Sequence, residues 1–313
     1  MFSDKFEFLE ITKSTYVITD RDIEKTMDMS AERRIGVSQH IYLVVGEKAA
    51  VIDPGTFQSP RHKIFEFAKS VNLKPSDIVY ILNTHTHDDH VQGNAYVKAI
   101  SGAKIAAHPL IIEKTQHMHT KTEQMWKEIT VDIPLKEGDK IDLGNNLSLT
   151  ALETPGHSPD HIVFYNDNEK TLFVGDLLQG REEYMHAGWL GLISNVEEYE
   201  KSLQRIGHMN INIILDPHHK PLFGCDISQC IENCLKRSQK IKETVYKVLM
   251  ETKKKLTLEN LHDEVIRKMY ARMLPYNVNA EGTPTTPLNL QTICAYVDNL
   301  VREHSNIHKK LIK

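Results

Sequence analysis

The sequence of 313 residues contains few cysteines. Its four cysteines, Cys225, Cys230, Cys234 and Cys294, all lie late in the chain. Cysteines this few and this late indicate reduced thiols and a cytoplasmic location. Cys230 and Cys234 are one helical turn apart and could bind a metal together with Cys225. Buried core thiols are favoured, because no histidine or cysteine partner stands at a finger-like spacing.

Long hydrophobic runs and a strong charge of one sign are missing as well. The charged N-terminus lacks the apolar core of a signal peptide, and no apolar run approaches the roughly eighteen residues that cross a bilayer. We therefore expect no membrane partner. The 38 Lys+Arg and 42 Asp+Glu give a net charge of −4. This mild acidity argues against a general nucleic-acid-binding protein, although it leaves room for a local basic patch.

Short β-branched runs alternate with turns over the first two-thirds of the chain. The runs expected to form strands are Ile41–Val45, Ala50–Asp53, Ile78–Leu82, Lys104–Ala107, Leu147–Leu152, His161–Tyr165, Thr171–Val174 and Ile211–Leu215. Helices are expected at His62–Val71 and Val196–Ile206. The run Ile78–Leu82 is apolar on both faces, as in a sheet that is covered on both sides. The pattern predicts a layered α/β domain over residues 1–224.

The character of the sequence changes near residue 225. Helical patterns follow over Asp226–Lys255, Leu258–Met273 and Leu288–Glu303, with a loop rich in Pro, Gly and Asn at 274–287. In the last helix one stripe is apolar, formed by Leu290, Ile293, Val297 and Leu300. We expect residues 225–313 to form an all-helical C-terminal cap.

Residues 83–94 read NTHTHDDHVQGN, with three histidines and two aspartates between positions 85 and 90. If the chain stays extended after the strand, His85 and His87 point to the same side. Asp89 and His90 then fall in the following turn, where they can face a neighbouring position. Imidazole suits zinc and iron, and carboxylate joins it when the ion is harder. Two such ligand pairs side by side indicate two metal ions rather than one.

Two ligand pairs do not complete two metal sites, so further ligands are expected after later strands. The candidates are His157 after the Pro-Gly turn at 155–156, Asp176 after the strand at 171–174, and His218 or His219 after the strand at 211–215. Ligand sites of α/β folds gather beyond the carboxyl ends of strands. The shared position of these residues indicates one common site.

The motifs HTHDDH, TPGH, GD and PHH, in this order, resemble the metallo-β-lactamase superfamily over roughly residues 12 to 224. The resemblance implies a four-layered αββα sandwich, here with an all-helical C-terminal appendage. It implies the following roles: His85, His87 and His157 at a first metal, Asp89, His90 and His219 at a second, Asp176 as the bridging carboxylate, and Asp53 as a structural aspartate.

The last motif departs from the family pattern. The family usually has Pro-Gly-His-Gly, whereas this chain has Pro-His-His-Lys at 217–220. Aligning the prolines makes His219 the expected ligand and puts His218 where glycine is common. Lys220 would then stand beside the metals and could hold an anionic group of the substrate, although a solvated surface lysine is the favoured interpretation.

Two divalent ions, most simply zinc, with iron or manganese as alternatives, would lower the pKa of a shared water from about 15.7 toward about 7. The resulting hydroxide needs no serine or cysteine nucleophile. We expect Asp89 both to ligate a metal and to orient this hydroxide. This chemistry fits hydrolysis of thioesters, esters, lactones, amides or phosphodiesters and does not choose among them. A metallohydrolase of a small ester or thioester is the favoured prediction.

Two segments are expected to line or cover the substrate pocket. Residues 179–191 carry Tyr184, His186 and Trp189, and residues 115–126 carry a second His-x-His at His117 and His119. Exposed loop residues or ordinary packing would explain both segments equally well, and we do not expect a third metal at the second His-x-His.

The branch of the superfamily stays open. The segments around TPGHSPDH and LFVGDLL, with the helical cap, look similar to the quinolone-signal response thioesterase and to the lactamase-like endoribonucleases. HVQGN at 90–94 resembles glyoxalase II and lactonase members, but the C-terminal substrate motif of the glyoxalase type is not evident. The alternatives are therefore a metal-dependent phosphodiesterase or endoribonuclease, a mono-iron persulfide dioxygenase and a metal-bearing regulator. A small-molecule substrate is the favoured partner, and a homodimer is compatible with the sequence.

Overall fold

The computed structural model describes most of the chain, as two compact units. The described residues are 6–20, 39–55, 61–110, 131–179, 190–253, 255–270, 287–304 and 307–311. The first unit holds residues 1–153, 160–176 and 210–224, and the second holds 154–159, 177–209 and 225–313. The expected C-terminal cap thus shares its unit with two earlier segments. A domain boundary at residue 225 stays a prediction.

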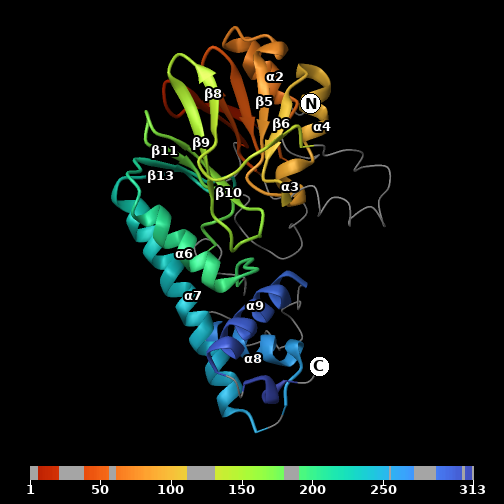
Figure 1. The fold of residues 1–313 in the computed structure, drawn as a ribbon, viewed down its shortest axis with the longest axis vertical. Helices are drawn as coiled ribbons and strands as arrows, with labels where there is room; N and C mark the ends of the chain where they lie inside the picture. The colour runs from red at the N-terminus through yellow and green to blue at the C-terminus, as the bar shows by residue number, and fades with distance from the viewer. Residues whose placement is uncertain are drawn as a thin grey trace. The chain divides into compact units, whose positions relative to one another are not determined.

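The first unit is built on two β-sheets, of which the larger has seven strands (Figure 1). In spatial order these are β1 (Phe6–Glu10), β2 (Thr15–Asp20), β3 (Ile41–Val45), β4 (Ala49–Ile52), β5 (Ile78–Leu82), β6 (Lys104–Ala107) and β7 (Ile133–Pro134). β1 to β4 pair antiparallel, and β4 to β7 pair parallel. The carboxyl ends of β4 and β5 therefore lie at the same edge of this sheet.

The second sheet has six strands and the same kind of mixed pairing. Its spatial order is β13 (Leu222–Phe223), β12 (Ile213–Leu215), β11 (Thr171–Phe173), β10 (Ile162–Asn166), β9 (Leu147–Glu153) and β8 (Lys140–Gly144). Only β11 and β12 run parallel, and the other neighbours are antiparallel. The chain after β11 and the chain after β12 consequently leave the sheet at one edge.

The two sheets share a hydrophobic core. Tyr42 and Leu82 of the first sheet pack in one cluster with Phe164 and Phe173 of the second. Burial of one such phenylalanine is worth about 1.5–3 kcal/mol. On the other face of the seven-stranded sheet, Ile81 packs in a separate cluster with helices α2 (Lys63–Ser70) and α4 (Asn94–Ser101). Adjacent residues of β5 thus enter two cores, which confirms that this strand is covered on both faces.

The second unit is helical. Its helices are α6 (Val196–Gly207), α7 (Cys225–Glu251), α8 (Leu258–Tyr270) and α9 (Pro287–Glu303), and a short 3-10 turn, η4, covers Ile307–Lys310. α7 packs against α6, α8 and α9 (Figure 1). Ile293, Val297 and Leu300 of α9 are buried, which confirms most of the apolar stripe expected there. Among the described residues, no helix combines the length and apolarity needed to span a bilayer.

The expected strands are all present, with small shifts of their ends. The strands β1, β2, β7, β8 and β13 and the helices α3 (Asp88–Val91) and α4 were not expected from the sequence. The expectation for the cysteines was correct only in part. All four are free, but Cys234 alone is buried, Cys230 and Cys294 are intermediate, and Cys225 is exposed.

Candidate metal centre

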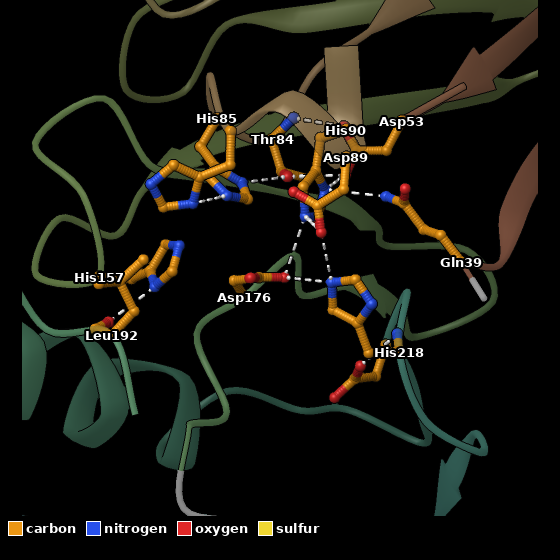
Figure 2. A network of polar contacts seen from close by, with 12 residues as sticks. Gln39, Asp53, Thr84, His85, Asp89, His90, His157, Asp176, Leu192 and His218 are labelled. Atoms are coloured by element: carbon orange, nitrogen blue, oxygen red, sulfur yellow. Dashed lines mark hydrogen bonds and ion pairs between the residues drawn. The ribbon is translucent and has the colours of Figure 1, made fainter. Parts of the chain in front are cut away.

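Histidines and carboxylates from the ends of several strands meet in the first unit (Figure 2). His85 and His87 follow β5, and Asp176 follows β11. The ligand atoms of these three residues lie within 4.8 Å of one another. A second group with the same spacing is formed by Asp89, His90 and His218, from α3 and the chain after β12.

Asp176 connects the two groups. Its Oδ1 lies 3.2 Å from Nε2 of His90 and 3.2 Å from Nε2 of His218. Burial raises the pKa of the Asp176 carboxyl, but the neighbouring His90 and His218 overcome this effect and hold the pKa well below its usual value. The carboxylate is therefore ionised, and its expected role as a bridge between two metals stays a prediction.

The site stabilises positive charge. Burial opposes protonation of His90, yet the carboxylates of Asp176, Asp89 and Asp53 raise the pKa of its imidazole well above the ordinary value. The pKa of His218 is also raised, because Asp176 and Asp89 outweigh its burial. Imidazole nitrogens and carboxylate oxygens that converge in a buried, negative site form a donor set that fits divalent cations such as zinc.

A hydrogen-bond network orients His90. Its Nδ1 lies 3.0 Å from Oδ2 of Asp53, and a carboxylate can only accept, so Nδ1 carries a proton and Nε2 is the nitrogen that could give up its proton to a metal ion. Asp53 is 2% exposed. Its carboxylate also accepts two hydrogen bonds from Thr84, one from the backbone N–H at 2.9 Å and one from the side-chain hydroxyl at 2.7 Å. This arrangement is a carboxylate–histidine pair of the kind that supports metal ligands.

The same network reaches His85. The Thr84 hydroxyl donates its proton to Asp53, so it accepts a hydrogen bond from Nδ1 of His85 at 3.1 Å. Nε2 of His85 then carries no proton and lies 2.8 Å from Nδ1 of His87. Nδ1 of His87 is then the donor of this hydrogen bond, and a bound ion could replace the shared proton.

The structure bears on the choice between His218 and His219 as the last ligand, which stays a prediction. His218, rather than the expected His219, joins Asp89 and His90. Oδ1 of Asp216 accepts a hydrogen bond from the backbone N–H of His218 at 2.8 Å and lies 3.0 Å from Nδ1 of His219. His218 lies with Nε2 at 3.4 Å from Oδ2 of Asp89.

The other expected site residues have varied positions. His157 belongs to the second unit, where it is buried and donates from Nδ1 to the carbonyl of Leu192 at 2.8 Å. Lys220 is exposed. The residues of the expected covering segments, namely Tyr184, His186, Trp189, His117 and His119, lie outside the described residues.

The structure adds supporting residues that sequence reasoning missed. Nε2 of His161 accepts a hydrogen bond from the backbone N–H of Asp176 at 3.1 Å. Burial, ahead of all other influences, lowers the pKa of His161 to about 4, which keeps its ring neutral and able to accept. A Cβ on Gly175 would lie 2.7 Å from this nitrogen and from the Thr84 hydroxyl, and φ is +52° there, so glycine is required before the bridging aspartate. The sequence signal was the polar run SPDH after TPGH.

Curated relatives match part of the chain. A hydroxyacylglutathione hydrolase from Polaromonas sp. is 37% identical over 110 residues, which is 35% of this chain and 37% of that protein. A hydroxyacylglutathione hydrolase from Bdellovibrio bacteriovorus is 32% identical over 160 residues, or 51% of this chain and 53% of that protein. The chain thus spans about half the length, or less, of these relatives.

Solved structures match over nearly the whole chain. A metallo-beta-lactamase family protein from Thermus thermophilus has a TM-score of 0.64 at 17% identity and covers 95% of both chains. A beta-lactamase domain protein from Burkholderia ambifaria has a TM-score of 0.68 at 16% identity, covering 97% of this chain and 91% of that one. Such low identity shows the fold alone, and the predicted metallo-β-lactamase fold is confirmed. Residues 34–218, more than half of the chain, match the family described as the metallo-beta-lactamase superfamily, and the protein therefore belongs to that superfamily.

Proposed function

We propose that the protein is a dinuclear metal-dependent hydrolase of small esters or thioesters. The observation that carries the proposal is the position of Asp176, which groups with His85 and His87 and whose Oδ1 also lies 3.2 Å from Nε2 of both His90 and His218 in the second group. A thioester between a hydroxy acid and glutathione is the first substrate to test, because the two partial relatives above are named hydroxyacylglutathione hydrolases.

We assign seven ligands to two divalent ions, with zinc favoured by the donor set. The proposed ligands are His85, His87 and His157 at the first ion, Asp89, His90 and His218 at the second, and Asp176 at both. His218 takes the place that sequence alone gave to His219. His157 is assigned as a ligand because it matches the TPGH motif of the superfamily. Its Nδ1–H donates to the carbonyl oxygen of Leu192, so Nε2 is the nitrogen that can bind a metal.

Bound divalent ions would supply a water of pKa near 7 and polarise the acyl carbonyl. The protein's own contribution is to orient the reacting groups. Asp89 is partly exposed, with 32% of its side chain accessible, and its Oδ2 lies 3.4 Å from Nε2 of His218. A carboxylate at this position can accept a proton from the attacking water and align it toward the acyl carbon.

The rigidity of the site supports this role. Asp53 and Thr84 fix the rings of His85 and His90 through hydrogen bonds of 2.7–3.1 Å. The neutral His161 fixes the backbone of Asp176. Groups that are held in place before the reaction need little reorganisation during it, which is a major source of rate enhancement.

The test is a substrate panel assayed with the protein reloaded in turn with zinc, manganese and iron. The panel contains a glutathione thioester, an oxygen ester, a lactone, a phosphodiester and a β-lactam. We expect the thioester to be cleaved fastest and two ions to be bound per chain by elemental analysis. His87→Ala should abolish hydrolysis and lower the metal content.

His208→Ala is the matched control. This histidine is exposed at the end of α6, where its ring contacts the carbonyl of Gln204, so its loss should change neither activity nor metal content. Fastest cleavage of the phosphodiester would replace the proposal by a nuclease. One iron per chain together with oxygen uptake would replace it by an oxygenase, and an active His87→Ala protein would refute the ligand assignment.

A further inference from the structure

Thr292 is a polar residue buried in the helical part of the second unit. It lies on α9 and has no exposed surface. A buried threonine in a helix often turns its hydroxyl onto the carbonyl one turn earlier in the same helix. Here the hydroxyl instead donates to the carbonyl of Gly191 at 2.7 Å and accepts from the backbone N–H of Ile193 at 3.1 Å.

These two hydrogen bonds hold the backbone on both sides of Leu192. The N–H of Leu192 donates to Oε1 of Gln179 at 2.9 Å, so three consecutive residues of the segment are held by side chains. Gly191 has φ of +85°, a conformation that glycine adopts without strain. The carbonyl of Leu192 is therefore fixed in position and direction.

That carbonyl sets the state of His157. It accepts the hydrogen bond from Nδ1 of His157 at 2.8 Å, and the ring is 1% exposed. A carbonyl oxygen cannot donate, so the bond places the proton on Nδ1 and leaves the lone pair on Nε2. The partner of the non-ligating nitrogen determines both the tautomer and the ring orientation of a metal-binding histidine.

We propose that Thr292 is a positioning residue for the metal centre: its hydroxyl holds the Gly191–Ile193 backbone, and through the Leu192 carbonyl it fixes His157 as an Nε2 ligand. This inference rests on the proposed function for the role of His157 as a ligand. Under this proposal, helix α9 contributes to metal binding as well as to packing through its apolar stripe. All contacts in the chain from Thr292 to His157 lie within the second unit.

The experiment compares Thr292→Val with Thr292→Ser in the full-length protein. Valine keeps the shape and removes the hydroxyl, and serine keeps the hydroxyl. Zinc affinity is measured on protein stripped of metal, by competition with a chromophoric chelator. Loss of a supporting partner weakens metal binding by about tenfold or more, so we expect about a tenfold loss at one of the two sites for valine. Serine should keep the original affinity.

A double-mutant cycle with His157→Ala separates positioning from a general structural role. If Thr292 acts through His157, then Thr292→Val should cause no further loss of zinc affinity once His157 is alanine. Destabilisation of the fold alone would lower the urea midpoint of the metal-free protein and leave the affinity unchanged. Should Thr292→Val fail to fold, Gln179→Met removes the second hold on Leu192 and should weaken zinc binding in the same way.

Unchanged affinity in Thr292→Val, or losses that add fully to those of His157→Ala, would overturn the positioning role and leave the proposed hydrolase intact. An equal loss in Thr292→Ser would overturn it as well, because the hydroxyl is retained there. Undiminished zinc binding by His157→Ala alone would overturn both the positioning role and the proposed ligand set.

Discussion

The network around Asp53 gives the most direct quantitative test of the metal centre. Asp53→Asn is the perturbation of choice, because φ is +47° at this position and asparagine, like aspartate, tolerates the left-handed region. The oxygen of asparagine can still accept from the Thr84 N–H. The amide NH2 then meets two donors, the Thr84 hydroxyl and Nδ1–H of His90, where Oδ2 had accepted from both.

The magnitude follows from the lost bonds. A hydrogen bond to a charged group contributes about 1.5–3 kcal/mol. One such bond is lost outright, and the Thr84 hydroxyl recovers only part of the other by rotating to accept from the amide. We expect the free energy of unfolding of the metal-free protein to fall by about 2–4 kcal/mol, short of the 5–15 kcal/mol of a typical domain, so the variant should still fold. Zinc affinity should fall by about tenfold to a hundredfold, since His90 loses its tautomer control.

Urea unfolding followed by circular dichroism measures the first quantity, with an unchanged m-value as the sign that the fold is intact. Chelator competition measures the second. Asp167→Asn is the matched control, because Asp167 forms a surface ion pair with Lys170 at 2.7 Å and its loss should change neither quantity. If Asp53→Asn retains full zinc affinity, then this network does not orient His90 and the account of the centre is wrong.

Three further predictions concern other parts of the structure. His218→Ala should reduce the metal content from two ions to one per chain by elemental analysis, whereas His219→Ala should retain two; the opposite result would restore the assignment made from sequence. Glu169→Gln should lower the free energy of unfolding by about 1–3 kcal/mol in urea, because this carboxylate accepts from the hydroxyls of Thr12 and Ser14 at 2.6 and 2.7 Å. Gly156→Ala should lower the melting temperature strongly, because the added Cβ would lie 2.3 Å from backbone atoms of Tyr199; an unchanged melting temperature would contradict this contact.

The layered architecture could be read from hydrophobic patterns where a strand is buried. β5 is apolar at successive positions because Ile81 and Leu82 enter different cores, and a run of this type has few interpretations. β1 gave no such signal. Its neighbouring residues Phe8 and Leu9 are both apolar and are 37% and 45% exposed, so hydrophobicity at these two positions does not separate an inward face from an outward one.

The residues of the metal centre could be predicted from order and spacing, but the direction of their side chains could not. His218 and His219 are chemically identical neighbours at the end of β12, and a motif alignment ranked them by the position of a proline. In the structure, Asp216 contacts the backbone of His218 and the ring of His219, and His218 is the one grouped with Asp89 and His90. The spacing of residues in the sequence does not determine which of two adjacent histidines faces the other ligands.

Thr292 shows a limit of a different kind. The sequence marks α9 by its apolar stripe, and a threonine beside that stripe reads as an ordinary boundary position. Its partners lie 99 and 101 residues earlier in the chain, beyond the reach of any local pattern. Burial changes the interpretation, because an unsatisfied hydroxyl in a protein interior costs about 1–3 kcal/mol. A threonine with no exposed surface must therefore form hydrogen bonds with its hydroxyl. Thr292 forms them with the Gly191–Ile193 segment, whose Leu192 carbonyl accepts from the proposed ligand His157. Packing of the apolar stripe alone therefore does not account for this residue of α9.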